Sequence, residues 1–266
     1  MQAPLARSMR VLTLQAFLCL VLTACALDGD GLSRPPEEAA RIAAWPAAGV
    51  VPSGEDALRA TGNEPYWSLH VDGDGLVFRM LGRDDPFVAP AFAMNAVDTG
   101  RVYRARTERR RLFATVRDRI CRDSMSGMPH PLAVTVSLDG EVFRGCGGEP
   151  VSLLRDVDWE VARLDGVALQ AEARMILRFG QDRRLSGVTP CSRFDGRYRV
   201  TGESLELGEI DTGGRTCPPE RAMEEQLLLE LLSRTRGFGI EPDGGLRLRT
   251  VEGRTLLARP GGKESR

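Results

Sequence analysis

The residues best suited to catalysis are an aspartate, two serines and a histidine that stand close together in the chain. Asp123, Ser124, Ser126 and His130 supply the side-chain types with which a serine hydrolase forms its nucleophile and base. His130 lies between two prolines, however, and neither serine stands in the Gly-x-Ser-x-Gly pattern of a nucleophile elbow. We therefore expect Asp123 and Ser126 to bond to the backbone of a loop. The sequence favours a protein that is not an enzyme, with an envelope hydrolase as an alternative.

A second group, Asn63-Glu64-Pro65-Tyr66-Trp67, places an amide, a carboxylate and two aromatic rings at the start of a strand. Aromatic walls with a few polar groups are typical of binding pockets. Asn63, Glu64, Tyr66 and Trp67 are therefore a candidate ligand or partner surface. The structural alternative, which we favour, is that Asn-Glu-Pro forms a turn and Trp67 fills the end of a barrel.

The cysteines predict disulfides. Cys19 and Cys25 lie near the N-terminus, and four cysteines remain further along the chain. An even number of cysteines in an exported protein is typical of disulfide bonds. Four cysteines allow three pairings, but one keeps each bridge on its own side of a boundary near residue 150. That pairing is Cys121–Cys146 and Cys191–Cys217. We expect no metal and no cofactor, because the chain has no Cys-x-x-Cys spacing and only two histidines.

The segments that must position these residues are short alternating strands joined by tight turns. Before residue 150 the pattern predicts three hairpins, formed by the ranges 66–71 with 76–80, 101–107 with 112–117, and 132–138 with 141–143. The middle turn carries Arg109-Arg110-Arg111, a solvated tip or, alternatively, a contact for anionic lipid head groups.

After residue 150 the strands continue and one helix interrupts them. We expect strands at 159–164, 175–179, 183–187, 196–200 and 204–207, and a final hairpin at 246–249 and 255–258. Pro219 at the first turn and the acidic residues after it predict a helix over 219–234. Met223, Leu227 and Leu231 recur every four residues, and Leu228 and Leu232 widen the apolar face that we expect to pack.

The second segment resembles the META domain of HslJ-like bacterial proteins. The matching motifs are Trp159, Leu177-x-Phe179, Arg184-Leu185-Ser186-Gly187, Cys191-Ser192-Arg193-Phe194, Gly196-x-Tyr198, Cys217 with the Leu-rich helix, and Leu246-x-Leu248. The resemblance implies an antiparallel, barrel-like sheet with one helix, similar to small lipid-binding pilot lipoproteins, and implies no settled biochemical activity.

The first segment is similar to another uncharacterised family of bacterial envelope domains. The motifs that carry this similarity are Gly62-Asn63-Glu64-Pro65-Tyr66-Trp67, Cys121-x-Asp123-x-Met125-Ser126-Gly127 and Gly145-Cys146-Gly147-Gly148.

The N-terminus has the form of an export signal. Arg7 and Arg10 precede an uncharged run that ends in Leu22-Thr23-Ala24-Cys25, and this order is typical of a secretory leader. The last four residues resemble the bacterial lipobox, which implies a lipid on the sulfur of Cys25. Ala26 at the next position resembles the default routing to the outer membrane. Multiple acyl chains at a single cysteine give stable anchoring.

These patterns predict a mainly β (α+β) fold with two small antiparallel β-barrel-like or sandwich-like domains. We expect a signal peptide (1–24), a flexible tether (25–56), an N-terminal β domain (57–150), a META domain (151–260) and a disordered tail (261–266). A formal net charge of −1 argues against nucleic acid as a partner.

The expected function is that of a non-enzymatic, lipid-anchored protein on the periplasmic side of the outer membrane. It would bind an envelope protein or a hydrophobic ligand during envelope maintenance or stress. The alternative is a carrier or sensor that holds a lipid or small ligand inside a barrel.

Overall fold

The computed structural model describes residues 57–169, 173–213 and 217–261. The expected signal peptide, the tether with Cys25, and residues 262–266 of the expected tail lie outside the described residues. Within the described part of the chain, no helix combines the length and the apolar character that crossing a bilayer requires.

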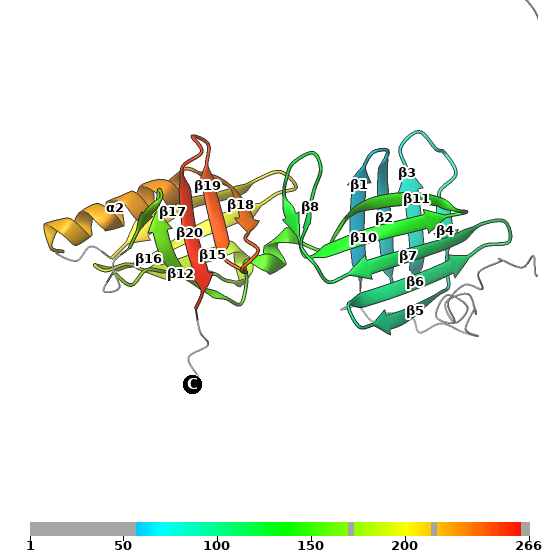
Figure 1. Cartoon of the computed structure of the whole chain (residues 1–266), viewed down its shortest axis with the longest axis horizontal. Helices are drawn as coiled ribbons and strands as arrows, with labels where there is room; N and C mark the ends of the chain where they lie inside the picture. Colours follow the sequence, from blue (N-terminus) through cyan, green and yellow to red (C-terminus); the bar gives the residue numbers. More distant parts are fainter. Residues whose placement is uncertain (1–56, 170–172, 214–216, 262–266) are drawn as a thin grey trace, which may run out of the picture. The chain divides into compact units, whose positions relative to one another are not determined.

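The first sheet is antiparallel throughout and curls back on itself into a nearly closed barrel (Figure 1). Its strand order is β4-β3-β2-β1-β11-β10-β7-β6-β5. The strands are β1 (Leu58–Asn63), β2 (Tyr66–Asp72), β3 (Gly75–Met80), β4 (Phe87–Ala89), β5 (Phe92–Val97), β6 (Gly100–Arg106), β7 (Arg111–Arg117), β10 (Leu132–Leu138) and β11 (Glu141–Gly147). A separate pair, β8 (Cys121–Arg122) and β9 (Pro129–His130), lies in the connection between β7 and β10.

The three expected hairpins of this sheet are confirmed, and their turns form for the predicted reasons. The backbone N–H of Asp74 donates to Asp72 Oδ1 at 3.0 Å, and Gly75 has a positive φ of 138°. Asp139 and Gly140 both have positive φ, as a tight type I′ hairpin turn requires. Strands β1, β4 and β5 come in addition to those hairpins, and β11 continues to Gly147 rather than ending at 143.

The interior of the first barrel is filled by side chains from alternate strand positions. Trp67, Phe78, Phe87, Tyr103 and Phe143 are all almost completely buried there. The rings of Trp67 and Phe78 lie 5.6 Å apart, and those of Phe78 and Phe143 lie 5.4 Å apart. Contacts of this kind hold the sheet closed because aromatic rings bury a large apolar area.

The second sheet is also antiparallel and barrel-like, with the order β17-β16-β15-β14-β12-β20-β19-β18 and with β13 beside β12. Its elements are β12 (Asp158–Leu164), β13 (Val167–Ala168), β14 (Ile176–Phe179), β15 (Arg184–Val188), β16 (Arg193–Val200), β17 (Leu205–Thr212), β18 (Thr235–Ile240), β19 (Leu246–Thr250) and β20 (Thr255–Pro260). Two 3-10 turns, Pro150–Leu153 and Gln181–Arg183, precede β12 and β15. The predicted mainly β class with two barrel-like domains is confirmed.

One helix, α2 (Pro219–Ser233), packs against this second sheet (Figure 1). Leu228, Leu231 and Leu232 are buried, but Met223 is 72% exposed, so its expected place on the packing face was wrong. At 3.6 residues per turn, Met223 lies about 140° around the helix from Leu228. The packing face is therefore centred on Leu228, Leu231 and Leu232. The spacing of four residues that includes Met223 placed the centre of this face wrongly.

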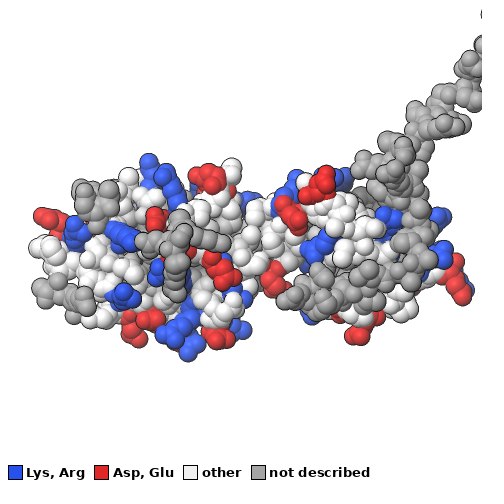
Figure 2. Space-filling view, turned by 90° about the horizontal axis from the view of Figure 1, so that it is seen from below, with Lys and Arg blue, Asp and Glu red and all other residues white. Residues whose placement is uncertain are grey.

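The surface carries mixed charge. Figure 2 shows acidic and basic side chains interspersed over the face in view. In the second domain many arginines are paired with carboxylates, for example Arg178 with Asp158 at 2.6 Å and Arg247 with Glu241 at 2.8 Å. Arg254 contacts both Asp165 and Glu230. Such exposed pairs contribute little stability each, but they leave these arginines without spare charge for a ligand.

The packing of α2 gives a direct test of the second core. Leu231→Ala removes a side chain that is only 1% exposed and is expected to lower the free energy of unfolding by about 2–5 kcal/mol. The matched control, Met223→Ala on the exposed side of the helix, is expected to change it by less than about 0.5 kcal/mol. Urea denaturation measures both, and equal effects would contradict this packing.

Candidate functional site

The connection between β7 and β10 is fastened to the outside of the first barrel by a disulfide. Cys121 in β8 is bonded to Cys146 in β11, with the two Cα atoms 5.5 Å apart. The bridge lies within the first domain, as predicted. The residues that follow Cys121 form a tight loop, in which the N–H of Asp123 donates to the Met128 carbonyl at 2.9 Å.

Asp123 organises this loop as a hydrogen-bond acceptor. Its Oδ1 accepts from the Met125 N–H at 3.0 Å, and from the N–H and the hydroxyl of Ser126 at 2.8 and 3.0 Å. Its Oδ2 accepts from Asn63 Nδ2 at 2.9 Å, and the same amide nitrogen also donates to Ser124 Oγ at 2.9 Å. The loop is thus fixed to the end of β1 as well as to β11.

These bonds set the charge state of Asp123. Burial by itself would raise the pKa of the carboxyl group. The hydrogen bonds from Ser126, Asn63 and Met125 outweigh burial and hold the pKa of Asp123 below its ordinary value. The loop therefore contains a carboxylate that stays ionised and is fully used by its own neighbours.

The four residues of the candidate ligand or partner surface do not share one environment. Glu64 is exposed and is joined to Pro65 by a cis peptide bond in the turn between β1 and β2. Tyr66 is 48% exposed, while Asn63 is held by the loop. Trp67 is 1% exposed and lies in the core. Three of them reach the surface, and Trp67 serves packing.

Trp67 explains two glycines on the neighbouring strands. A Cβ atom added to Gly62 or to Gly145 would collide with the indole ring and with backbone carbonyls. Glycine is therefore required at both positions, because only a strand without side chains lets the ring lie against β1 and β11. This contact fixes the wall of the barrel that faces the disulfide-bonded loop.

The residues considered for a hydrolase are engaged otherwise. The Ser126 hydroxyl donates to Asp123, and the Ser124 oxygen accepts from Asn63. His130 Nδ1 lies 2.8 Å from the carbonyl oxygen of Gly148, so the ring must donate a proton there. Within the described residues, no hydrogen bond joins His130 to either serine.

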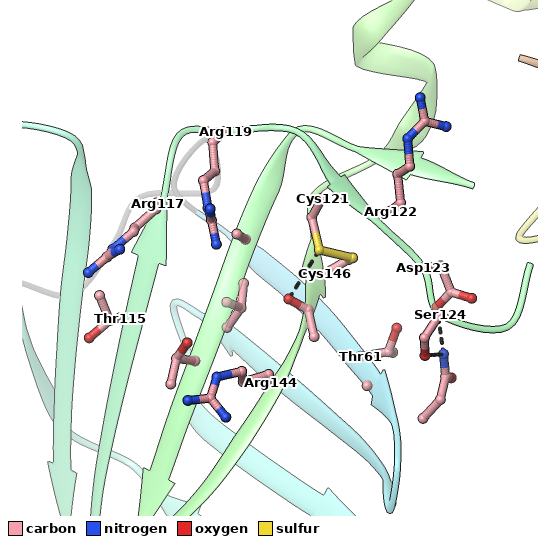
Figure 3. Close-up of a pocket in the computed structure, with 16 residues that line it drawn as sticks. Thr61, Thr115, Arg117, Arg119, Cys121, Arg122, Asp123, Ser124, Arg144 and Cys146 are labelled. Carbon is pink, nitrogen blue, oxygen red and sulfur yellow. Dashed lines mark hydrogen bonds between the residues drawn. A yellow bond between two sulfur atoms is a disulfide. The ribbon is translucent and has the colours of Figure 1, made fainter. Parts of the chain in front are cut away.

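Beside the loop lies a groove of about 550 Å³ on the outer face of the first sheet (Figure 3). Strand register builds its floor. Thr115 on β7 stands opposite Thr135 on β10, which in turn stands opposite Arg144 on β11. The next row runs from Arg117 through Ala133 and Cys146 to Thr61. The loop residues from Cys121 to Ser124 form one wall.

Arginines surround this groove. Figure 3 shows Arg117, Arg119 and Arg144 around the sheet face that carries Thr115, whereas Arg122 points away from them. In the described part of the chain, no hydrogen bond or ion pair engages the side chains of Arg117, Arg119 or Arg144. Asp123 is the sole carboxylate on the lining, and its oxygens already accept bonds from the loop. The groove thus presents positive charge that the protein does not neutralise.

Sequence reasoning did not identify these arginines and directed attention to the arginine triplet at the β6–β7 turn instead. There, Arg110 forms ion pairs with Asp85 and Asp139, both at 3.2 Å, which leaves its charge satisfied. The usable signal was strand alternation. It places Arg117 on the same outward face as Thr115, and Arg144 outward between the inward-facing Phe143 and Gly145.

The second domain has its own disulfide, between Cys191 and Cys217, with the Cα atoms 5.4 Å apart; this pairing was predicted too. Nearby, Glu225 of α2 accepts hydrogen bonds from the hydroxyls of Thr189 and Ser192. Although both sulfurs and the Glu225 carboxylate lie within 4.8 Å of one another, sulfur binds metals as thiolate, and these sulfurs are bonded to each other. The cluster joins the helix to the loop before β16.

A protein-family match covers the second domain. Residues 152–261 match the META domain family, so this segment of the chain is a META domain. The chain is also similar to a protein from Burkholderia xenovorans whose structure was solved by NMR. The two are 24% identical over 42% of this chain and 87% of the other, with a TM-score of 0.36. No curated protein matches the chain.

The loop makes a prediction about pH. Because folding lowers the pKa of Asp123, the unfolded chain binds the proton more readily. The carboxylate's contribution to stability is therefore present above pH 3.8, its ordinary pKa, and is lost as the pH falls through the lower folded value. Asp123→Ala is expected to cost about 1–2 kcal/mol near neutral pH, and this difference should shrink below the ordinary pKa.

Denaturation of the wild type and the variant across this pH range measures the effect. The matched control is Asp118→Ala, because Asp118 is exposed and its side chain makes no hydrogen bond in the described part of the chain. A cost for Asp123→Ala that is independent of pH would show that the charge of Asp123 does not stabilise the loop.

Proposed function

We propose that this protein is a non-enzymatic lipoprotein of the bacterial envelope. It is anchored through a lipid on Cys25, faces the periplasm from the outer membrane, and binds a partner molecule through the outer face of its first barrel. The groove lined by Arg117, Arg119 and Arg144 carries this proposal, because it combines open volume, a fixed wall and cationic groups that have no partner among the described residues.

A site on the outside of the barrel is favoured over one inside it. A carrier that enclosed a ligand would need room among the inward-facing side chains. In the first domain those positions hold Trp67, Phe78, Phe87, Tyr103 and Phe143, packed as one cluster. The groove between the loop and the sheet offers open space on the outer face, and threonines and arginines are among the residues that line it.

Binding rather than catalysis follows from what the polar groups near the groove are doing. A nucleophilic serine needs a base within hydrogen-bond reach. Ser126 donates to a carboxylate that is itself saturated by loop hydrogen bonds, and His130 is turned to a backbone carbonyl. These groups fix the conformation of the loop, and a rigid loop on a rigid barrel is suited to recognition of a partner.

The META domain complements the first barrel as a compact second unit. Its helix is closed onto the sheet through Leu228, Leu231 and Leu232, and its disulfide and Glu225 fix the remaining loop. We assign the primary recognition to the first barrel, because three arginines surround one groove there, whereas several arginines of the second domain, among them Arg178, Arg247 and Arg254, are paired with carboxylates.

The anchoring part of the proposal is tested by Cys25→Ala expressed with its leader intact. The wild-type protein is expected in the membrane fraction and the variant in the soluble periplasmic fraction, because removal of the sulfur removes the acyl chains. Metabolic labelling with palmitate gives an independent readout. A variant that still sediments with membranes and carries label would overturn the anchor at Cys25.

The binding part is tested by a photo-crosslinking amino acid at Thr135, in the floor of the groove, in living cells. A discrete adduct is expected there, and it should be lost when Arg117→Glu and Arg144→Glu reverse the local charge. Val88 on β4 of the same barrel is 50% exposed, does not line the groove and is the control position; Arg79→Glu is the control charge reversal. Equal adducts from Thr135 and Val88, or none from Thr135, would contradict a partner at the groove.

A further inference from the structure

The chemistry of the groove narrows the class of partner. Arg117 and Arg119 lie two positions apart at the end of β7, and Arg144 comes from β11, yet the three meet around one stretch of sheet (Figure 3). In the second domain, by contrast, Arg178, Arg247 and other arginines each face a carboxylate. Guanidinium groups that remain unpaired around one concavity form a local positive potential, and a low-dielectric wall strengthens it.

Hydroxyl groups lie in the middle of this ring of charge. Thr115 and Thr135 stand opposite each other in the register, and Thr61 lies at the far edge of the same lining. Each is partly buried, and none has a side-chain hydrogen-bond partner among the described residues. A threonine hydroxyl can donate one hydrogen bond, so the floor offers neutral donors between the cationic ones.

Among the described residues that line the groove, Asp123 is the one acidic group, and its oxygens are already engaged. Asp123 Oδ1 accepts from Met125 and Ser126, and Oδ2 accepts from Asn63. The disulfide holds that carboxylate in the loop wall, while Arg144 lies on β11, in the row next to Cys146. The groove therefore lacks an internal anion that would have to be displaced before a ligand binds.

We propose that the groove binds a phosphate group of its partner, with Arg117, Arg119 and Arg144 as the cationic contacts and the threonine hydroxyls as further donors. This rests on the proposed binding function and names its ligand class. A phosphate offers several oxygens and up to two negative charges, and guanidinium forks bind such oxygens in pairs. A carboxylate offers two oxygens and one charge, which would leave part of this donor set unused.

The test is an NMR titration of the full chain carrying Cys25→Ser, which removes the lipid, with inorganic phosphate and with acetate at equal ionic strength near neutral pH. Shifts are expected to concentrate at residues of the groove, with a dissociation constant at least about tenfold lower for phosphate. Arg144→Gln should weaken phosphate binding by about tenfold. Arg79→Gln, an exposed arginine on β3 outside the groove, should leave it unchanged.

Three results would overturn the phosphate assignment: no shifts at the groove, equal affinity for acetate, or an equal loss with Arg79→Gln. Circular dichroism of each variant checks that the fold is retained. Because exposed charges are screened by ions, binding that is insensitive to salt would also contradict it.

Two further arms distinguish the source of the phosphate. If it belongs to a lipid head group, the Cys25→Ser chain should co-sediment with vesicles of phosphatidylglycerol and phosphatidylcholine. It should not co-sediment with phosphatidylcholine alone, because choline offsets the charge of that lipid's phosphate, and Arg144→Gln should abolish the binding. If it belongs to a soluble molecule, glycerol phosphate should bind and the vesicles should not.

The phosphate assignment and the binding function fail separately. A charge-dependent adduct at Thr135 in cells, together with no phosphate shifts, would retain a partner at the groove and reject phosphate as its recognised group.

Discussion

The covalent bond between Cys121 and Cys146 is the constraint on which the outer surface of the first barrel depends. It joins the connection after β7 to β11, two parts of the chain that the sheet alone would leave independent. Asp123 then uses its carboxylate to close the loop, and Asn63 ties the loop to β1. A disulfide that closes a loop of this kind restricts the unfolded chain. In the folded protein it also holds the loop as a wall beside the arginines of the groove.

Behind that wall, aromatic side chains fill the interior of the first barrel. Trp67 lies against Gly62 and Gly145, and its contact with Phe78 extends the aromatic core inward. The groove and its arginines lie together on the outer face of the first barrel. There, strand register places Thr115, Thr135 and Arg144 in one row. In the META domain Glu225 accepts hydrogen bonds from Thr189 and Ser192, and several surface arginines pair with carboxylates. The two barrels share an architecture, and in the first one three arginines without a partner among the described residues surround a single groove.

Local features could be predicted from the sequence, and features that depend on closure of the sheet could not. Asp72 to Gly75 and Asp139-Gly140 indicate their turns by residue type alone. The two cysteine pairs, with separations of 25 and 26, lie on opposite sides of residue 150, and this position indicated the correct bridges. Met223 was misplaced because a repeat of four does not fix the centre of a helix face. The arginines of the groove escaped notice because Arg117 and Arg144 are 27 positions apart in the sequence. They meet only through the register of β7, β10 and β11, which no single strand pattern contains.

If the groove binds a partner in the cell, that partner covers Arg117, Arg119 and Arg144. Arginine-specific modification with phenylglyoxal, compared between intact envelopes and the purified protein and read by mass spectrometry, tests it most directly. Arg117, Arg119 and Arg144 are expected to be shielded in the envelope and reactive after purification, while Arg79 reacts equally in both. Equal reactivity of all four arginines in the two preparations would contradict it.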